Sequence, residues 1–537
     1  MNFSRSSFRL LRAALTFLML LACLTSAGAQ EEPPPQQRSN VYQNPVIAGD
    51  FPDPSVIRVK EDYWATATSG EWAPEFPILH SRDLVNWEVV GAVFHKRPIW
   101  AERNFWAPEI SEYRGRYFVY YTARKKGGPL CVAVASSLTP QGPYTDHGPL
   151  VCQEIGSIDA MTVVDESGER YLIWKEDGNS RNQPTPLWAQ KLNEEGTRLV
   201  GSRRELIRND PKSWEGGVVE GAFILRHDGW FYLFYSGNAC CGRRCNYALG
   251  VARSKRLLGP WEKNPSNPIL AENQVWQCPG HGSIVSDERG HDFLLYHAYQ
   301  KSEEAFYIGR EAMLDEVGWD SSGWPSINSG KGPSEQAPVP LNTAQRRAPA
   351  SFFDDFDSSV LKPGWQWPQE REPVVQIETA HEGRLILTTT TIEQADDPTG
   401  AILSQPVTSA DYVATVLINT DGMKREALAG LAAYSGRADA LGIAAGAGKV
   451  IIYLREGKKQ RVIKTLNAPT QASLLYLRMS VTDGSHYRFA FSSDGREWKE
   501  ASESVNASSL EGARISLTAG GIKGASAKFE WIRITPS

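Results

Sequence analysis

Aromatic and β-branched residues gather in short runs along the first part of the chain, and most runs follow a polar turn such as Arg114-Gly115 or Asp228-Gly229. Such runs predict β-strands, because these side chains pack well on a pleated surface and Gly or Asp favours the preceding turn. No helical period of 3.6 residues competes with this pattern. Successive runs start 54, 54, 60 and 62 residues apart, at Tyr63, Tyr117, Tyr171, Phe231 and Phe293.

A second element follows the first, second and fourth runs, at residues 81–87, 136–144 and 254–261. Each copy begins with serine and ends with tryptophan or tyrosine. A repeat of this length that contains only strands and turns is typical of a four-stranded propeller blade. Five copies predict a five-bladed β-propeller over residues 43–330.

The composition changes after this repeat. Residues 325–350 are rich in Pro, Ser and Gly, and we assign a linker to residues 331–350. Beyond it, alternating or apolar segments at 384–388, 412–417 and 449–453 predict strands again. We interpret residues 351–537 as a β-sandwich, so the expected fold class is all-β: a five-bladed propeller followed by a sandwich.

The N-terminus is typical of a processing segment. Three arginines precede an apolar stretch at 13–24 and a small-residue cleavage site at 27–29, which predicts a signal peptide over residues 1–29. The stretch is too short to span a membrane comfortably, so we expect a secreted or periplasmic protein without a membrane span. Lipid anchoring through Cys23 is an alternative. Residues 30–42 are rich in Pro and Gln and predict a disordered linker.

The net charge and the cysteines restrict the binding partners and the covalent links that we expect. The net charge of −5 argues against a nucleic-acid partner, which would need a basic patch. An exported protein forms disulfides, and an even number of cysteines permits full pairing, although the pairing itself is not readable from the sequence. A metal site at the cluster 240–245 is the weaker alternative, because no histidines lie at ligand spacing. Six cysteines follow the signal segment: Cys131, Cys152, Cys240, Cys241, Cys245 and Cys278.

Three carboxylates lie where predicted blades begin. Asp53 opens the first blade between two prolines, Asp159 opens the third, and Glu220 opens the fourth after two valines. The first strands of all blades start at one end of the axial channel, so we expect these carboxylates to converge. Hydrolysis of a glycosidic bond needs such a set, because one group protonates the leaving oxygen and another activates water.

Each of these residues also has a purely structural interpretation. Asp53 before Pro54 is a common turn residue, and Glu220 could be a solvent-exposed strand end. We expect instead that Glu220 is buried, that burial raises its pKa, and that it stays protonated.

Several short motifs, taken in order, resemble glycoside hydrolase family 43, over about residues 43–330. The resemblance implies an inverting mechanism with Asp53 as general base, Glu220 as general acid, and Asp159 as the carboxylate that raises the pKa of the acid and orients it. The motifs are Asn44-Pro45-Val46, Phe51-Pro52-Asp53-Pro54-Ser55, Trp106-Ala107-Pro108-Glu109, Ile158-Asp159, Glu220-Gly221 and Gly280-His281-Gly282-Ser283.

The same resemblance implies further roles. Arg310 would bind the sugar in the innermost subsite, and Trp106 would form a wall of that subsite. His281 would bind substrate, or would hold a calcium ion indirectly or a water cluster near the channel axis. Packing in the core is the structural alternative for both Trp106 and His281. No cofactor is required, and a structural Ca²⁺ in the channel is an option. The second domain resembles concanavalin-like modules, which bind carbohydrate or complete the wall of a site.

Two other classes of protein are alternatives. An invertase-type or fructanase-type propeller would be retaining and would carry Asn-Asp-Pro and Glu-Cys motifs, whereas this chain has Pro-Asp-Pro and Glu-Gly. A non-catalytic sugar-binding propeller is the other alternative, since fold alone does not decide function. Within the family, the sugar stays open among β-xylosidase, α-L-arabinofuranosidase, endo-arabinanase and galactan-active members, with a pentose-containing plant polysaccharide preferred.

Overall fold

The computed structural model describes residues 40–302, 305–340, 351–379, 383–390, 392, 397–436, 438–468 and 473–537. The predicted signal peptide, Cys23 and most of the predicted 30–42 linker lie outside these residues. In the part that is described, no helix is long and apolar enough to cross a bilayer.

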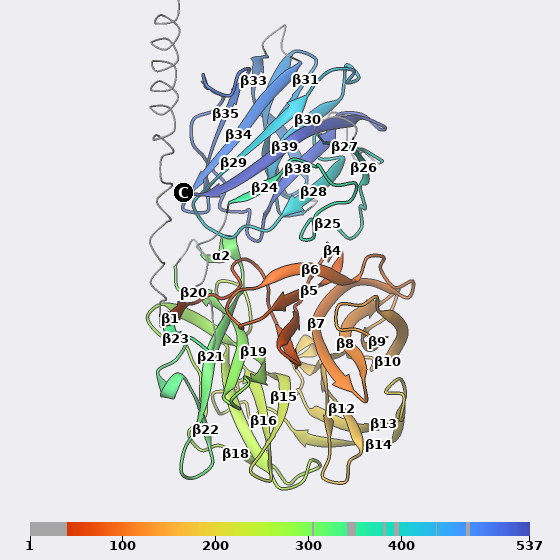
Figure 1. Ribbon diagram of the computed structural model, residues 1–537, viewed down its shortest axis with the longest axis vertical. Coiled ribbons are helices and arrows are strands. Elements are labelled where there is room, and N and C mark those ends of the chain that lie inside the picture. The colour runs from red at the N-terminus through yellow and green to blue at the C-terminus, as the bar shows by residue number, and fades with distance from the viewer. Residues whose placement is uncertain are drawn as a thin grey trace, which may run out of the picture. The chain divides into compact units, whose positions relative to one another are not determined.

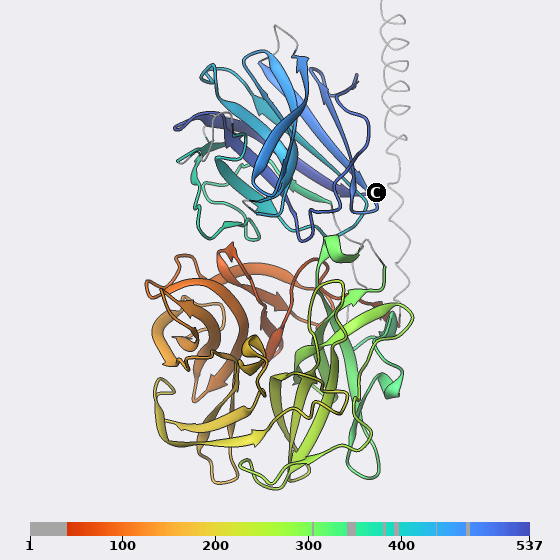
Figure 2. The same cartoon turned by 180° about the vertical axis from the view of Figure 1, so that it is seen from behind.

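Five four-stranded antiparallel sheets follow one another along the chain, each built from strands in chain order, with the short β4 (Trp72–Ala73) left out of the first (Figures 1 and 2). The first two are β2 (Ser55–Val59), β3 (Asp62–Thr66), β5 (Glu75–Ser81) and β6 (Glu88–Phe94), then β7 (Ala101–Tyr113), β8 (Arg116–Lys125), β9 (Leu130–Ser137) and β10 (Thr145–Val151). The third is β11 (Ser157–Val164), β12 (Arg170–Glu176), β13 (Leu187–Leu192) and β14 (Leu199–Ile207). The last two are β15 (Val219–His227), β16 (Trp230–Gly237), β17 (Ala248–Ser254) and β18 (Glu262–Lys263), then β19 (Trp276–Ser286), β20 (Asp292–Gln300), β21 (Glu311–Trp319) and β22 (Pro325–Ile327).

The first strands of the sheets form a closed ring. β2 contacts β7, β7 contacts β11, β11 contacts β15, β15 contacts β19, and β19 returns to β2. Each of the five aromatic runs read from the sequence falls in the second strand of its sheet, where its side chains fill the layers between neighbouring blades. The predicted five-bladed propeller is confirmed.

A clasp of two short strands joins the ends of the propeller. β1 (Val41–Gln43) pairs with β23 (Gln336–Pro338), so that Tyr42 faces Ala337. The Asn44 side chain also exchanges hydrogen bonds with the backbone of Leu314 in the fifth blade. The predicted boundaries were therefore wrong at both ends: residues 41–42 form a strand rather than a disordered linker, and residues 336–338 belong to the propeller rather than to the linker.

The second domain consists of two antiparallel sheets with an apolar core between them. The alternation noted at 384–388 and 412–417 places one side of these strands in this core, which confirms the sandwich. One sheet contains β24 (Phe352–Asp354), β26 (Val374–Glu378), β27 (Arg384–Thr388), β29 (Tyr412–Asn419), β34 (Leu474–Thr482), β35 (His486–Ser492), β36 (Lys499–Glu500), β37 (Val505–Asn506) and β39 (Ser526–Pro536). The other contains β28 (Ala401–Gln405), β30 (Leu428–Tyr434), β31 (Ala440–Gly446), β32 (Lys449–Glu456), β33 (Lys459–Asn467) and β38 (Arg514–Gly520).

Candidate active site

Bulges in the ring strands place the candidate residues. The pairing register shifts after Trp106 in β7, after Ile158 in β11, after Glu220 in β15 and after Gly280 in β19. The residue that follows each of these positions has a positive φ, between 40° and 58°. A bulge of this kind bends its strand and turns a side chain away from the regular alternation. Asp159 and His281 are two of these bulge residues.

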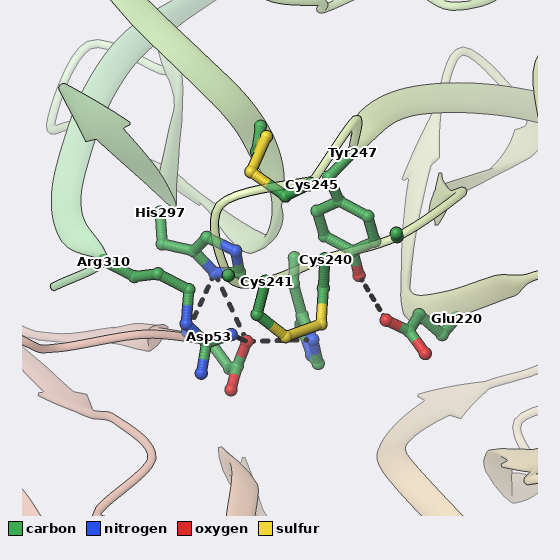
Figure 3. The surroundings of a disulfide bond; sticks show 12 residues. Asp53, Glu220, Cys240, Cys241, Cys245, Tyr247, His297 and Arg310 are labelled. Atoms are coloured by element: carbon green, nitrogen blue, oxygen red, sulfur yellow. Dashed lines mark hydrogen bonds and ion pairs between the residues drawn. A yellow bond between two sulfur atoms is a disulfide. The ribbon is translucent and has the colours of Figure 1, made fainter. Parts of the chain in front are cut away.

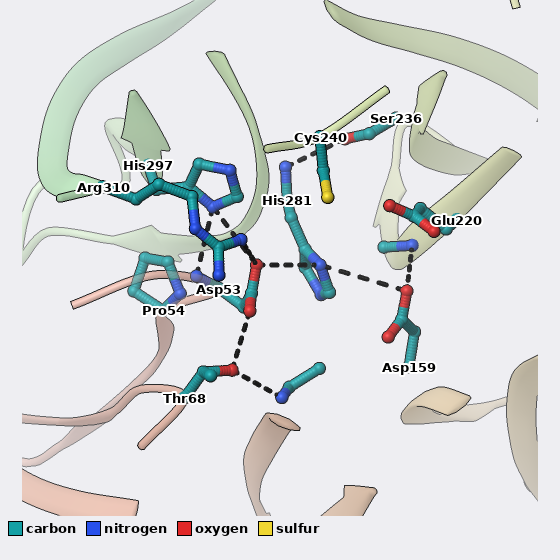
Figure 4. Close-up of polar contacts among 12 residues, drawn as sticks. Asp53, Pro54, Thr68, Asp159, Glu220, Ser236, Cys240, His281, His297 and Arg310 are labelled. Atoms are coloured by element: carbon teal, nitrogen blue, oxygen red, sulfur yellow. Dashed lines mark hydrogen bonds and ion pairs between the residues drawn. The ribbon is translucent and has the colours of Figure 1, made fainter. Parts of the chain in front are cut away.

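Asp53 lies just before β2, also with a positive φ (54°), and polar groups bind both of its carboxylate oxygens (Figure 4). Arg310 Nη1 donates to Oδ1 at 3.1 Å, and His281 Nδ1 lies 3.3 Å from the same oxygen. Thr68 Oγ1 donates to Oδ2 at 2.7 Å and itself accepts the Ala107 N–H. This arrangement fixes the carboxylate and leaves it surrounded by positive charge and donors.

Electrostatics keep Asp53 ionised. Burial alone would raise its pKa, but the Arg310 cation, His281 and His297 together hold the pKa well below its ordinary value. His297 Nδ1 accepts the backbone N–H of Asp53 at 3.1 Å, so this nitrogen carries a lone pair in the neutral ring. Burial lowers the pKa of His297 to about 4, which agrees with a neutral ring near pH 7. We therefore attribute the lowered pKa of Asp53 mainly to Arg310 and His281.

Asp159 is linked to both of the other carboxylate centres. Its Oδ2 accepts the backbone N–H of Gly221 at 3.0 Å, and His281 Nδ1 lies 4.0 Å away from the same oxygen. Gly221 has a φ of 58°, and a Cβ there would lie 2.8 Å from the His281 ring, so a side chain at this position would displace the histidine. The glycine of the Glu220-Gly221 motif is thus explained by close packing as well as by the bulge.

Glu220 is buried, as expected, and both of its oxygens are engaged. Tyr247 Oη donates to Oε1 at 2.9 Å, and Lys175 Nζ donates to Oε2 at 2.6 Å. Lys175 comes from β12, is 1% exposed, and also lies 3.3 Å from Asp177 Oδ1. The pKa of Lys175 is raised, because the neighbouring carboxylates outweigh the effect of burial, so the lysine remains a cation.

The expectation that burial would keep Glu220 protonated was wrong. Burial does raise its pKa, but the ion pair with Lys175 is stronger, and the net pKa is lowered. Asp159 has the opposite balance: burial, together with repulsion from Glu220 and Asp53, raises its pKa to about 6 despite His281 and Lys175. Below about pH 6 the ligand-free site therefore holds its exchangeable proton on Asp159 rather than on Glu220, and at pH 7 both groups are largely ionised.

Removal of the lysine cation should take away the main interaction that keeps Glu220 ionised. In Lys175→Met we expect the pKa of Glu220 to rise, since the variant removes the cation that holds it down while burial, which raises it, remains. If Glu220 must be protonated to act, the alkaline limb of the kcat/KM profile moves to higher pH. Lys191→Met is a matched control on the adjacent strand, where the side chain is 40% exposed and pairs with Glu169. If the alkaline limb does not move, Lys175 does not control the pKa of the catalytic acid.

The raised pKa of Asp159 predicts a cost to stability. The unfolded carboxyl has a pKa of about 3.9. Below about pH 4 Asp159 is protonated in both the folded and the unfolded protein. Between about pH 4 and pH 6 only the folded protein keeps the proton. Above about pH 6 the folded protein carries a buried charge that disfavours folding. Asp159→Asn should therefore raise the free energy of unfolding at pH 7 by about 3 kcal/mol, the free-energy equivalent of a pKa raised from about 3.9 to about 6. Denaturant titrations at pH 7 and near pH 4 test this. The gain in the free energy of unfolding should be present at pH 7 and absent near pH 4.

The Asp159→Asn variant also tests how Asp159 affects the pKa of Glu220. Without the Asp159 anion, Glu220 ionises more easily, so the alkaline limb of the pH–rate profile should move to lower pH. An unshifted limb with full activity would leave Asp159 with a structural role alone.

Two other predicted residues have definite places. Arg310 contacts Asp53 directly, whereas Trp106 is half-buried on β7, next to the residue that binds Thr68, and its role as a subsite wall stays a prediction. The sequence reasoning missed Lys175, His297, Tyr247 and Thr68. A charged or imidazole side chain inside an apolar strand was the available signal for the first two, at Ile173-Trp174-Lys175 and Tyr296-His297-Ala298.

The residues around His281 do not suit a directly bound calcium ion. Calcium takes six to eight oxygen ligands. Here two carboxylates face His281, but Arg310 already occupies one of them, and the part of the chain that the structure describes has no group of three or more His, Cys, Asp or Glu arranged to hold a metal. We therefore derive no step through a metal ion.

The six cysteines form three disulfides, which excludes the metal alternative for the cluster at 240–245. The pairs are Cys131–Cys152, Cys240–Cys241 and Cys245–Cys278. The last two lie beside the candidate site (Figure 3).

Comparison with known families agrees with this architecture. The model of glycosyl hydrolases family 43 matches residues 42–325, and that of the beta xylosidase C-terminal concanavalin A-like domain matches residues 353–535. The chain therefore belongs to glycosyl hydrolase family 43, and its second domain is concanavalin-like, as the motifs implied.

The individual relatives have low sequence identity to this chain. A xylosidase/arabinosidase of Butyrivibrio fibrisolvens is 29% identical over 310 residues, which cover 54% of this chain and 57% of the relative. Xylosidase/arabinosidase 43B of Humicola insolens is 27% identical over 373 residues, covering 64% of this chain and 65% of the relative. These matches span less than two thirds of either relative. The crystal structure of the GH43 BlXynB protein from Bacillus licheniformis has a TM-score of 0.78 at 25% identity and covers 93% of this chain and 100% of that one.

Proposed function

We propose that this protein is an inverting glycoside hydrolase with Asp53 as general base, Glu220 as general acid and Asp159 as the carboxylate that modulates the acid. The observation that carries the proposal is the contrast between the carboxylates. Asp53 has a strongly lowered pKa, whereas the pKa of Asp159 is about 6. Buried carboxyl groups whose environments separate their pKa values are typical of acid–base catalysis.

In this mechanism each group has one task. Asp53 accepts a proton from a water molecule as that water attacks the anomeric carbon. Glu220 donates a proton to the glycosidic oxygen as the bond to the leaving group breaks. Asp53 and Glu220 lie on either side of His281 (Figure 4). The product sugar has the inverted configuration, because water enters opposite the leaving group.

Glu220 can donate only if it first gains a proton and frees an oxygen. Lys175 is shared between Glu220 at 2.6 Å and Asp177 at 3.3 Å. A shift of the ammonium toward Asp177 when substrate binds would weaken the ion pair, so that burial would raise the pKa of Glu220 and the proton held on Asp159 could be transferred. Lys175 then acts as a positioning residue that decides which carboxyl is the acid.

The proposed substrate is a terminal β-xyloside or α-L-arabinofuranoside of a plant polysaccharide or oligosaccharide. Support comes from the names of the relatives, among them a putative beta-xylosidase of Escherichia coli and an exo-arabinofuranosidase of Cellvibrio japonicus. Side-by-side assays with 4-nitrophenyl β-D-xyloside and 4-nitrophenyl α-L-arabinofuranoside test the choice. Turnover of neither, with release of arabinose oligomers from arabinan, would favour an endo-acting enzyme instead.

The stereochemical outcome is a separate prediction. Proton NMR recorded during the first minutes of hydrolysis should detect the inverted anomer before mutarotation. Detection of the retained anomer would contradict the proposal and would make Asp53 a nucleophile rather than a base.

We also propose that the protein is exported. Three disulfides within one domain are compatible with an oxidising compartment and uncommon in the cytosol, which supports the signal-peptide prediction. N-terminal sequencing of protein recovered from the periplasm or the medium tests cleavage after residue 29.

A further inference from the structure

The loop between β16 and β17 carries two disulfides of different kinds. Cys245–Cys278 ties the loop to β19, three residues before His281, and joins positions 33 residues apart. Cys240–Cys241 joins immediate neighbours in the sequence. The two bridges therefore constrain the chain on very different scales.

The Cys240–Cys241 bridge lies against residues that contact the catalytic groups. Cys240 packs on the buried cluster of Tyr247, Cys278 and Tyr299. Tyr247 donates its hydroxyl to Glu220, and its ring stacks on His297 with centroids 5.8 Å apart. Figure 4 draws Cys240 beside His281 and Glu220, and Figure 3 draws both cysteines of the bridge between Asp53 and Glu220 in that view.

Stability does not account for this bridge. A disulfide stabilises mainly by closing a loop in the unfolded chain, and a link between neighbours closes almost none. The loop is already held by Cys245–Cys278 and by the hydrogen bond from Asn246 N to Ala239 O at 3.0 Å. Nor does the bridge fill a core, because Cys241 is exposed and Cys240 is only half-buried.

The bridge supplies an apolar surface beside the polar groups of the site. The groups placed around the proposed reaction centre are charged or hydrogen-bonding: carboxylates, histidines, an arginine and a lysine. A sugar ring also has apolar C–H faces, which need an apolar surface of fixed shape. Two neighbouring cysteines joined through sulfur form a small closed ring with few rotatable bonds and a polarisable apolar face.

We propose that the Cys240–Cys241 disulfide is a substrate-contacting wall of this site, on which the pentose ring held by the carboxylates rests. The assignment depends on the proposed function, because it takes the sugar to bind between Asp53 and Glu220. It makes the pair a determinant of sugar affinity and specificity that takes no part in proton transfer.

The test compares two double variants. In Cys240→Ala/Cys241→Ala the wall is lost and the loop anchor stays, so we expect KM for the aryl pentoside to rise about tenfold, as for loss of one apolar contact group. The dissociation constants of free D-xylose and L-arabinose, measured by calorimetry, should rise similarly, and the melting temperature should change little. In Cys131→Ser/Cys152→Ser, which opens a bridge in the second blade, the melting temperature should fall and KM should stay.

Other outcomes overturn the proposal. Native KM and native pentose affinity in the Cys240→Ala/Cys241→Ala protein would do so, as would peptide mapping in which both cysteines of the unreduced wild type react with iodoacetamide. The calorimetric arm needs no turnover. If loss of the bridge weakens pentose binding but the wild-type protein hydrolyses no glycoside, the proposed function is contradicted and the role of the disulfide is not.

Discussion

Asp53→Asn is expected to lower kcat on every glycoside by about 10²- to 10⁴-fold, the usual contribution of a general base. The amide cannot accept a proton from water, whereas the wild-type carboxylate is held ionised by Arg310 and His281. Because water must be activated whatever the leaving group, the loss should be the same on aryl glycosides and on natural oligosaccharides. Steady-state kinetics on both substrate types measure this.

Controls separate loss of the base from loss of the fold. Asp62→Asn, in the same blade and 36% exposed in its side chain, should retain wild-type rates. Asp53→Ala leaves space for a small anion, and added azide should restore turnover by attacking the anomeric carbon in place of water. Formation of a glycosyl azide of inverted configuration is the expected product; no rescue together with a normal melting temperature and normal rates would argue against the role of base.

Glu220→Gln should show a loss that depends on the leaving group. We expect about a 10²- to 10⁴-fold decrease on oligosaccharides, whose alkoxide leaves only with a proton, and at least a tenfold smaller decrease on 4-nitrophenyl glycosides. The glutamine has one acceptor oxygen where the carboxylate has two, so Tyr247 and Lys175 cannot both keep their hydrogen bonds. Some loss of stability should therefore accompany the change.

The control for Glu220→Gln is the same substitution at an exposed glutamate. Glu194→Gln removes an exposed carboxylate that pairs with Arg114 in the second blade's turn, and it should leave both rates unchanged. A Glu220→Gln enzyme with equal losses on both substrate types would assign Glu220 a role other than proton donation.

Local patterns were sufficient for the fold and for the main carboxylates. Each strand run and each turn was readable from neighbouring residues, and repetition of the unit gave the number of blades. Since the first strands of a propeller start around one channel, Asp53, Asp159 and Glu220 could be expected near one another without any knowledge of contacts. Their surroundings confirm that they are buried and lie around His281.

The charge state of the site could not be predicted in the same way. Glu220 and Lys175 are 45 residues apart and meet only because β12 of one blade lies beside β15 of the next. The hydroxyl of Tyr247 and the ring of His297 likewise come from other strands. A pKa depends on all charges within a few ångströms, so an acid that looks isolated in the sequence can have the opposite shift once the blades pack.

The clasp of β1 and β23 links closure of the propeller to the order of synthesis. Val41 pairs with Pro338, so the first strand waits until 297 further residues have been added, about 15 to 60 s at ordinary rates of elongation. During most of that interval the Tyr42 hydroxyl and the Val46 N–H lack their final acceptors, the backbone carbonyls of Leu314 and Ala312. A gene fragment cut after residue 330 would encode all five blades and still leave this seam open. A fragment meant to produce the propeller by itself should extend past residue 338.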